Sequence, residues 1–173
     1  MGIGHSPSRG RKVAKALVVD SRLCVGCGRC ELTCSYHLFK VFNPYRAAIK
    51  VVKMEPGVDT PVFCVQCGIC MNACPEGALY RDPETLVVRV DEEKCKGCPI
   101  CAMACPFGAI HVDPETGKAV KCDYCGECVE TCPQEALRLV EMEDLPWFRT
   151  RSMAVAVTAA PQLARWLWYK LPG

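Results

Sequence analysis

Short apolar runs bounded by polar or turn-forming residues recur along this chain, and they predict short β-strands. The first run is Ala-Leu-Val-Val at 16–19, and a longer one occupies 49–54. Two more, at 86–90 and 118–120, come after an Asp-Pro-Glu-Thr sequence, in which proline suits the second position of a type I turn. We therefore expect each of these two runs to be the return strand of a small hairpin.

The outgoing strands of these hairpins belong to an internal repeat. Related sequences at 77–80, 108–111 and 135–138 each place a short strand soon after a Cys-Pro pair. Repetition of one supersecondary unit predicts a pseudosymmetric architecture. The runs at 16–19 and 137–140 have no hairpin partner of their own, so we expect them to pair with each other.

Four cysteines with the spacing C-x2-C-x2-C-x3-C precede each of these units, and a further copy lies near the start of the chain. The spacing is typical of bacterial 4Fe-4S proteins, in which three thiolates hold one cluster and the fourth holds the other cluster of a pair. All 16 cysteines fall into such quartets, which predicts four 4Fe-4S clusters. The quartets are Cys24, Cys27, Cys30, Cys34; Cys64, Cys67, Cys70, Cys74; Cys95, Cys98, Cys101, Cys105; and Cys122, Cys125, Cys128, Cys132.

Two other uses of cysteine fit this pattern less well. Structural zinc requires two separated C-x2-C pairs per ion, which a compact quartet does not supply. A disulfide scaffold needs an oxidising compartment, and closely spaced cysteines suit a metal cluster better than a cross-link.

Because the conventional hydrophobic core is modest, we expect the chain to be unfolded or molten without iron. We expect exposure to oxygen to have the same effect slowly.

The intervals between quartets predict how the clusters pair. The second and third quartets are separated by one hairpin, so residues 64–121 should form a self-contained inner dicluster module. Residues 16–63, with an inserted loop, and 122–142 should then be the two halves of an outer module. The predicted fold class is α+β: two bacterial-ferredoxin-like dicluster modules, one inserted in the other, with short β-hairpins and a C-terminal extension.

The two ends of the chain differ from these modules. Residues 1–15 are basic and contain Gly and Pro, which predicts a disordered or partner-bound tail. The tail lacks the features of a secretory or twin-arginine signal, so we expect a cytoplasmic protein. Residues 143–173 carry three tryptophans and an apolar stretch, 153–160, that is shorter than the ~20 residues of a membrane span. We expect this extension to dock on a partner subunit or another copy; the alternatives are packing on its own core and contact with a membrane surface.

Charge and motif content exclude several function classes. The formal net charge is +2 with cysteine counted as neutral. Each oxidised cluster with four thiolates adds about −2, so the loaded protein is acidic and is not suited to binding nucleic acid. The sequence contains no Gly-rich phosphate loop, Ser-His-Asp arrangement or supported carboxylate pair. We therefore predict no catalytic residues.

We expect structural roles for the three histidines and for the glycines that lie within the cysteine quartets. His5, His37 and His111 stand apart from any second catalytic group in the sequence, and we expect loop or strand roles for them. Several glycines lie within the quartets, where a missing side chain allows close approach to a cluster. These are Gly26, Gly28, Gly68, Gly97 and Gly126.

The first quartet departs from the repeat. Cys34 is followed by Ser35 instead of proline, and an aromatic turn segment, Phe42-Asn-Pro-Tyr-Arg46, precedes the strand at 49–54. A quartet, an Asn-Pro-x-Arg segment with a strand, and three further quartets resemble the four-cluster iron-sulfur subunit of tungsten-containing aldehyde oxidoreductases. The resemblance covers residues 16–142. Related small subunits serve formate dehydrogenase, dimethyl sulfoxide reductase and the tungsten benzoyl-CoA reductase.

This resemblance implies a non-catalytic electron-transfer subunit. Its clusters would form a wire between a large catalytic subunit with a tungsten or molybdenum pterin and an external partner such as a ferredoxin or a flavoprotein. The alternatives are a freestanding polyferredoxin or storage protein, or the small subunit of one of the related complexes. An iron-sulfur sensor or structural module is less favoured, because four clusters exceed what sensing needs.

The bacterial ferredoxin rule exchanges the fourth ligand within each pair of clusters. For the inner pair it predicts Cys64, Cys67, Cys70 with Cys105, and Cys95, Cys98, Cys101 with Cys74. For the outer pair it predicts Cys24, Cys27, Cys30 with Cys132, and Cys122, Cys125, Cys128 with Cys34. Lysines flank the third quartet and acidic residues lie in the fourth, so we expect the cluster on Cys95, Cys98 and Cys101 to be the easier of these two to reduce.

Overall fold

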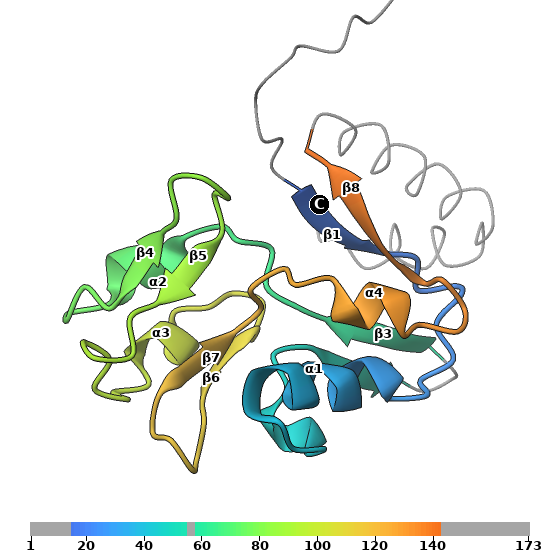
Figure 1. Ribbon diagram of the computed structural model, residues 1–173, viewed down its shortest axis with the longest axis horizontal. Helices are drawn as coiled ribbons and strands as arrows, with labels where there is room; N and C mark the ends of the chain where they lie inside the picture. The colour runs from blue at the N-terminus through green and yellow to red at the C-terminus, as the bar shows by residue number, and fades with distance from the viewer. Residues whose placement is uncertain (1–14, 55–57, 143–173) are drawn as a thin grey trace, which may run out of the picture.

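The structure is a computed structural model that describes residues 15–54 and 58–142 (Figure 1). The predictions made for 1–14, including His5, and for the extension at 143–173 lie outside the described residues. The elements run, in chain order, β1 (Lys15–Val19), α1 (Arg29–Phe39), the 3-10 turn η1 (Pro44–Arg46), β2 (Lys50–Met54), β3 (Val58–Val62), α2 (Ile69–Ala73), β4 (Leu79–Arg81), β5 (Val88–Val90), α3 (Ile100–Met103), β6 (Ile110–Val112), β7 (Ala119–Lys121), α4 (Glu127–Glu130) and β8 (Leu137–Glu141).

The strands form antiparallel pairs, and all three predicted pairs are confirmed. The hairpins β4–β5 and β6–β7 follow the predicted turns. In the first of these turns, Asp82 Oδ1 accepts hydrogen bonds from the backbone N–H groups of Glu84 and Thr85, at 2.9 and 3.0 Å. β1 pairs with β8 over its whole length, with Leu17 opposite Leu139. This pairing joins segments that lie more than a hundred residues apart. It was predicted because the apolar runs at 16–19 and 137–140 have no hairpin partner of their own.

One strand was not predicted. β3 pairs with β2 in an antiparallel hairpin, and Pro61 lies opposite Val51. Proline has no N–H to donate to a ladder, and it is therefore confined to edge positions. In a two-stranded sheet both strands are edges, so this proline is tolerated although it argues against a strand in the sequence.

The length of each helix follows from the residue after the fourth cysteine of its quartet. Proline follows Cys74, Cys105 and Cys132, and the helices of these quartets, α2, α3 and α4, are each at most five residues long. Ser35 follows Cys34 instead, so α1 continues for 11 residues. Ser35 is fully buried, donates its hydroxyl to Leu32 O and accepts the N–H of Asn43, which turns the chain back after the helix.

The buried apolar residues form two separate clusters. In Figure 1, α2, α3 and the hairpins β4–β5 and β6–β7 lie together on one side, while α1, α4, β1, β3 and β8 lie on the other. α2 packs against α3, and α1 packs against α4. Cysteines contribute to both clusters: Cys70 and Cys101 to the first, Cys30 and Cys128 to the second. Within the described ranges, no helix is long and apolar enough to cross a bilayer.

Candidate metal centres

Three of the four cysteine quartets lie in a loop with left-handed backbone at two fixed positions. These are the residue two after the first cysteine and the residue after the second cysteine. The pairs are Gly26 and Gly28, Gln66 and Gly68, and Tyr124 and Gly126; in the third quartet Gly97 is left-handed at the first of these positions. Left-handed residues curl the backbone tightly, which gathers the first three cysteines of a quartet. Glycine supplies this conformation at least cost, yet Gln66 at φ 59° and Tyr124 at φ 61° adopt it too.

Gly97 is needed for a reason other than approach to a cluster. A Cβ atom at this position would lie 2.1 Å from the backbone oxygen of Gly117. Such a distance is far inside van der Waals contact, and neither backbone can move away without disturbing the β6–β7 turn. Gly97 therefore allows a close approach between two backbones, and its approach to a cluster stays a prediction.

Two cavities are each lined by four cysteines. Cys64, Cys67 and Cys70 of the second quartet line one cavity together with Cys105, the last cysteine of the third. The other cavity is lined by Cys24, Cys27 and Cys30 of the first quartet together with Cys132, the last of the fourth. Each cavity therefore combines three cysteines of one quartet with the last cysteine of another. Apolar side chains, including Ile110 and Leu137, complete the walls.

The remaining cysteines also come together across quartets. The pKa of Cys125 is raised to about 12 and that of Cys128 to about 11, mainly by burial, and the nearby charge of Cys34 contributes to both increases. Burial likewise raises the pKa of Cys101, with Cys95 and Cys74 as charged neighbours that add to the rise. Cys34 thus lies among the cysteines of the fourth quartet, and Cys74 lies beside those of the third.

Backbone N–H groups point at the sulfur atoms of several cysteines. Two of them repeat: Ala78 N donates to Cys74 Sγ and Ala109 N donates to Cys105 Sγ, each at 3.4 Å. The first quartet lacks the turn that makes this contact possible. There Ala48, beyond the inserted Phe42–Arg46 segment, donates to Cys34 Sγ at 3.3 Å. The insertion therefore restores a hydrogen bond that the longer helix α1 removes.

Three matches to the 4Fe-4S dicluster domain family overlap along the chain, at residues 23–79, 63–109 and 87–133. The polyferredoxin-like subunit of aliphatic sulfonate oxidoreductase from Pyrococcus furiosus is 40% identical over 142 residues, which cover 78% of this chain and 82% of that protein. The chain belongs to the 4Fe-4S dicluster family. The electron transfer subunit of thiosulfate reductase from Salmonella typhi is 31% identical over 144 residues, 72% of this chain and 74% of that subunit. Both relatives are named as subunits of oxidoreductases, one as a polyferredoxin-like subunit and the other as an electron transfer subunit, which is consistent with a non-catalytic iron-sulfur subunit.

Among solved structures, a chain of the BamBC active-site complex of benzoyl coenzyme A reductase is similar, with 23% identity and a TM-score of 0.45 over 76% of this chain and 78% of that one.

The chemistry of these cysteines suits the clusters of the 4Fe-4S dicluster family. Iron-sulfur clusters are held by thiolates, and a thiolate is stabilised by N–H groups that donate to its sulfur. Burial raises the pKa of Cys30 to about 12, so without metal this thiol stays protonated at neutral pH. Cluster binding must therefore release protons, which makes it depend on pH. Once bound, a 4Fe-4S cluster supplies one-electron transfer.

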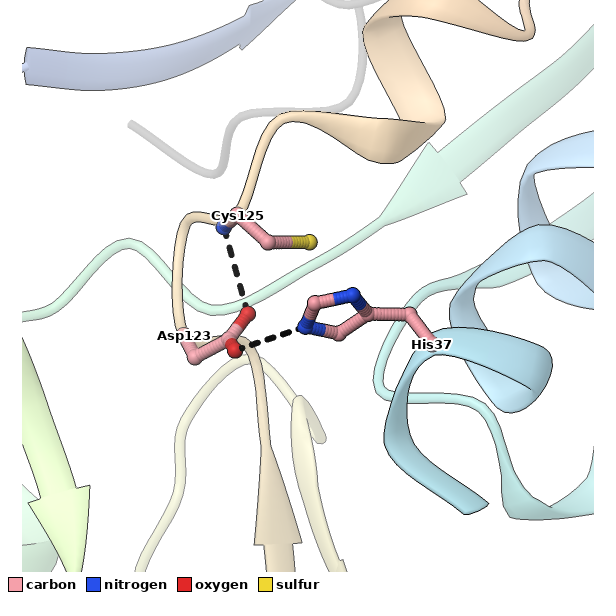
Figure 2. A group of neighbouring side chains, drawn as sticks. All are labelled: His37, Asp123 and Cys125. Atoms are coloured by element: carbon pink, nitrogen blue, oxygen red, sulfur yellow. Dashed lines mark hydrogen bonds and ion pairs between the residues drawn. The ribbon is translucent and has the colours of Figure 1, made fainter. Parts of the chain in front are cut away.

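His37 is not isolated, contrary to the expectation from the sequence. Its Nε2 lies 3.2 Å from Asp123 Oδ2, and the N–H of Cys125 donates to the other oxygen of Asp123, also at 3.2 Å (Figure 2). Ligand atoms of these three residues lie within 4.8 Å of one another. His37 comes from α1 and the other two from the loop before α4, which lie side by side. A spacing of 86 residues between His37 and Asp123 hid this contact in the sequence.

Proposed function

We propose that this chain is the electron-transfer subunit of an oxidoreductase complex and carries four 4Fe-4S clusters as a wire. The observation that carries the proposal is the pair of cavities, each lined by three cysteines of one quartet and the last cysteine of another. This is the ligand exchange of a two-cluster ferredoxin. The number of cysteines accounts for four such clusters with none left over.

The proposed ligands follow from these contacts. The cavities support Cys64, Cys67, Cys70 with Cys105, and Cys24, Cys27, Cys30 with Cys132. The charged neighbours of the buried thiols support Cys95, Cys98, Cys101 with Cys74, and Cys122, Cys125, Cys128 with Cys34.

We further propose that the clusters lie in two nested modules. Residues 64–121 form the inner module, and 16–63 with 122–142 form the outer one. Three observations support this division: the β1–β8 pair, the packing of α1 on α4 and α2 on α3, and the two separate apolar clusters. In this proposal the extension at 143–173 docks on a partner subunit.

The partner in this proposal is a large catalytic subunit with a tungsten or molybdenum pterin, of the aldehyde oxidoreductase type. An exposed aromatic patch supports a subunit over a freestanding polyferredoxin. Phe42 is 70% exposed and Tyr45 is 84% exposed, while Tyr36 stacks on Phe42 with ring centroids 4.7 Å apart. Aromatic side chains are enriched at protein interfaces. A ferredoxin or flavoprotein would exchange electrons at the other end of the wire, in the cytoplasm.

Anaerobic pull-down of an affinity-tagged copy from the native host tests this proposal. The expected result is a stable complex whose large subunit contains tungsten or molybdenum together with a pterin. Replacing Phe42 and Tyr45 by serine should weaken the complex and leave the iron content of the tagged chain unchanged. A tagged chain that carries its iron but elutes as a lone monomer would favour the freestanding polyferredoxin.

A further inference from the structure

Lys121 is a buried lysine at the point where the chain passes from the hairpin β6–β7 into the fourth quartet. Lys121 is only 6% exposed, and a lysine is almost never buried unless its ammonium group has partners. Its Nζ lies 2.9 Å from Gln66 Oε1, 2.5 Å from Val88 O and 2.8 Å from Cys122 O. Three oxygen acceptors therefore surround the nitrogen.

These acceptors fit an ammonium group. A charged lysine has three N–H donors and no acceptor, whereas a neutral amine would turn a lone pair towards one of the oxygens. The orientation of the Gln66 amide is fixed independently, because its Nε2 donates to Cys122 O at 2.8 Å and its Oε1 also accepts the N–H of Val88 at 3.0 Å. The amide oxygen is thus held facing Lys121. The site is built to keep a positive charge inside the protein.

Lys121 also borders the cysteine cavity of the second quartet. It lines that cavity together with Cys64, Cys67, Cys70 and Cys105. Gln66, which holds Lys121, is the left-handed residue between Cys64 and Cys67. Burial lowers the pKa of Lys121, whereas the negative charges of Cys64, Cys122, Cys70 and Asp123 act to raise it. No carboxylate forms an ion pair with its Nζ among the described residues.

We propose that the buried Lys121 ammonium raises the reduction potential of the cluster held by Cys64, Cys67, Cys70 and Cys105, and so makes this cluster the electron-holding site where the inner and outer modules meet. The inference rests on the proposed four-cluster function. Reduction adds one negative charge to the cluster, and a fixed positive charge beside it favours the reduced state. In the protein interior this attraction is much stronger than at the surface, where salt screens charges over about 8 to 10 Å.

The test is a potentiometric titration of the anaerobic holoprotein, followed by electron paramagnetic resonance. Lys121→Met removes the charge and keeps the length of the side chain. We expect the midpoint of one cluster to fall markedly more than those of the other three. Lys96→Met is the matched control, because Lys96 also adjoins a cysteine of a quartet but is exposed, and its shift should be much smaller.

A second variant protects the test against misfolding. Gln66→Glu places a negative charge beside Lys121 Nζ while that lysine stays in place, and it should lower the midpoint of the same cluster. Unchanged midpoints in both variants, equal shifts of all four clusters, or loss of the cluster from both variants would overturn the inference. The iron content and the number of signals of the wild-type protein test the four-cluster function by themselves. A failure of the Lys121 inference can therefore be distinguished from a failure of the proposed function.

Discussion

Arg46 forms a two-pronged ion pair with Asp113, with Nε to Oδ1 at 2.7 Å and Nη2 to Oδ2 at 2.8 Å. The two residues are 67 positions apart, and their side chains are 6% and 0% exposed. The guanidinium also reaches Glu115 and stacks on the ring of Phe39, 4.0 Å from its centroid. Arg46 belongs to the inserted segment after α1, and Asp113 begins the turn between β6 and β7. The pair therefore fastens the insertion of the first quartet to the hairpin of the third.

Removing the arginine should destabilise this junction. Arg46→Met leaves the Asp113 carboxylate buried with two hydrogen bonds from Thr116, one from its N–H and one from its hydroxyl, but without a compensating charge. An uncompensated buried charge typically costs about 3 to 5 kcal/mol. The denaturant concentration at which the visible cluster absorbance disappears should fall accordingly. Arg22→Met is the control, because its ion pair with Asp20 is exposed and worth little. Similar midpoints for the two variants would show that the Arg46 pair contributes nothing to stability.

The exchanged ligands can be tested by counting iron in paired variants. Cys67→Ser and Cys105→Ser should affect one cluster, so the double variant should lose about 4 iron atoms, no more than either single variant. Cys98→Ser combined with Cys105→Ser should affect two clusters and lose about 8. If the second pair loses no more iron than its single variants, Cys105 serves the cluster of its own quartet and the exchange is wrong.

His111 should make stability depend on pH. It is half-buried, its Nε2 has no hydrogen-bond partner in the described structure, and burial lowers its pKa below the usual 6.5. Below pH 6.5 the unfolded chain takes up a proton that the folded chain refuses, so stability falls as the pH falls. His111→Leu should change little at pH 7.5 but should slow cluster loss in denaturant at about pH 5.5. If the rate of cluster loss depends on acid pH identically in the wild type and in His111→Leu, the prediction is wrong. His37→Leu is the control.

Surface charge should order two of the potentials. We expect the cluster on Cys95, Cys98 and Cys101 to be easier to reduce than the one on Cys122, Cys125 and Cys128. Lys94 is paired with Asp91 at 3.0 Å, so the positive charge at the third quartet comes from the exposed Lys96 and from Lys118, whose Nζ donates to Cys95 O at 2.8 Å. Lys96→Glu should lower the midpoint potential of the cluster on Cys95, Cys98 and Cys101. Glu127→Lys should raise the midpoint potential of the cluster on Cys122, Cys125 and Cys128. If neither reversal moves a midpoint in the direction of its sign, hydrogen bonding or burial sets the order instead.

Local signals in the sequence predicted much of the fold. The aspartates at 82 and 113 begin the turns that an Asp-Pro-Glu-Thr sequence favours, and each caps its turn by hydrogen bonds from the backbone. The strands β1 and β8 could be paired by elimination, because each was apolar and had no local partner. Cysteine spacing identified every candidate ligand. In the turns and the cysteine loops, a few neighbouring residues determine the conformation.

What the sequence did not predict depends on contacts between distant residues or on balances of small energies. Nothing near Lys121 in the sequence shows that Gln66 and two carbonyl oxygens will surround it. The contact of His37 with Asp123 requires α1 to extend past Cys34, which follows from the absence of one proline. β3 contains Pro61 and was missed because propensity argued against a strand, whereas pairing with β2 decided the outcome.

Iron and sulfide analysis of anaerobically prepared protein, with electron paramagnetic resonance of the reduced state, tests the central claim most directly. Four 4Fe-4S clusters predict about 16 iron and about 16 sulfide atoms per chain, with signals from interacting clusters. Removal of the iron should abolish cooperative folding, because the clusters supply much of the core. About 8 iron atoms in fully loaded protein, or zinc in place of iron, would contradict the four-cluster wire.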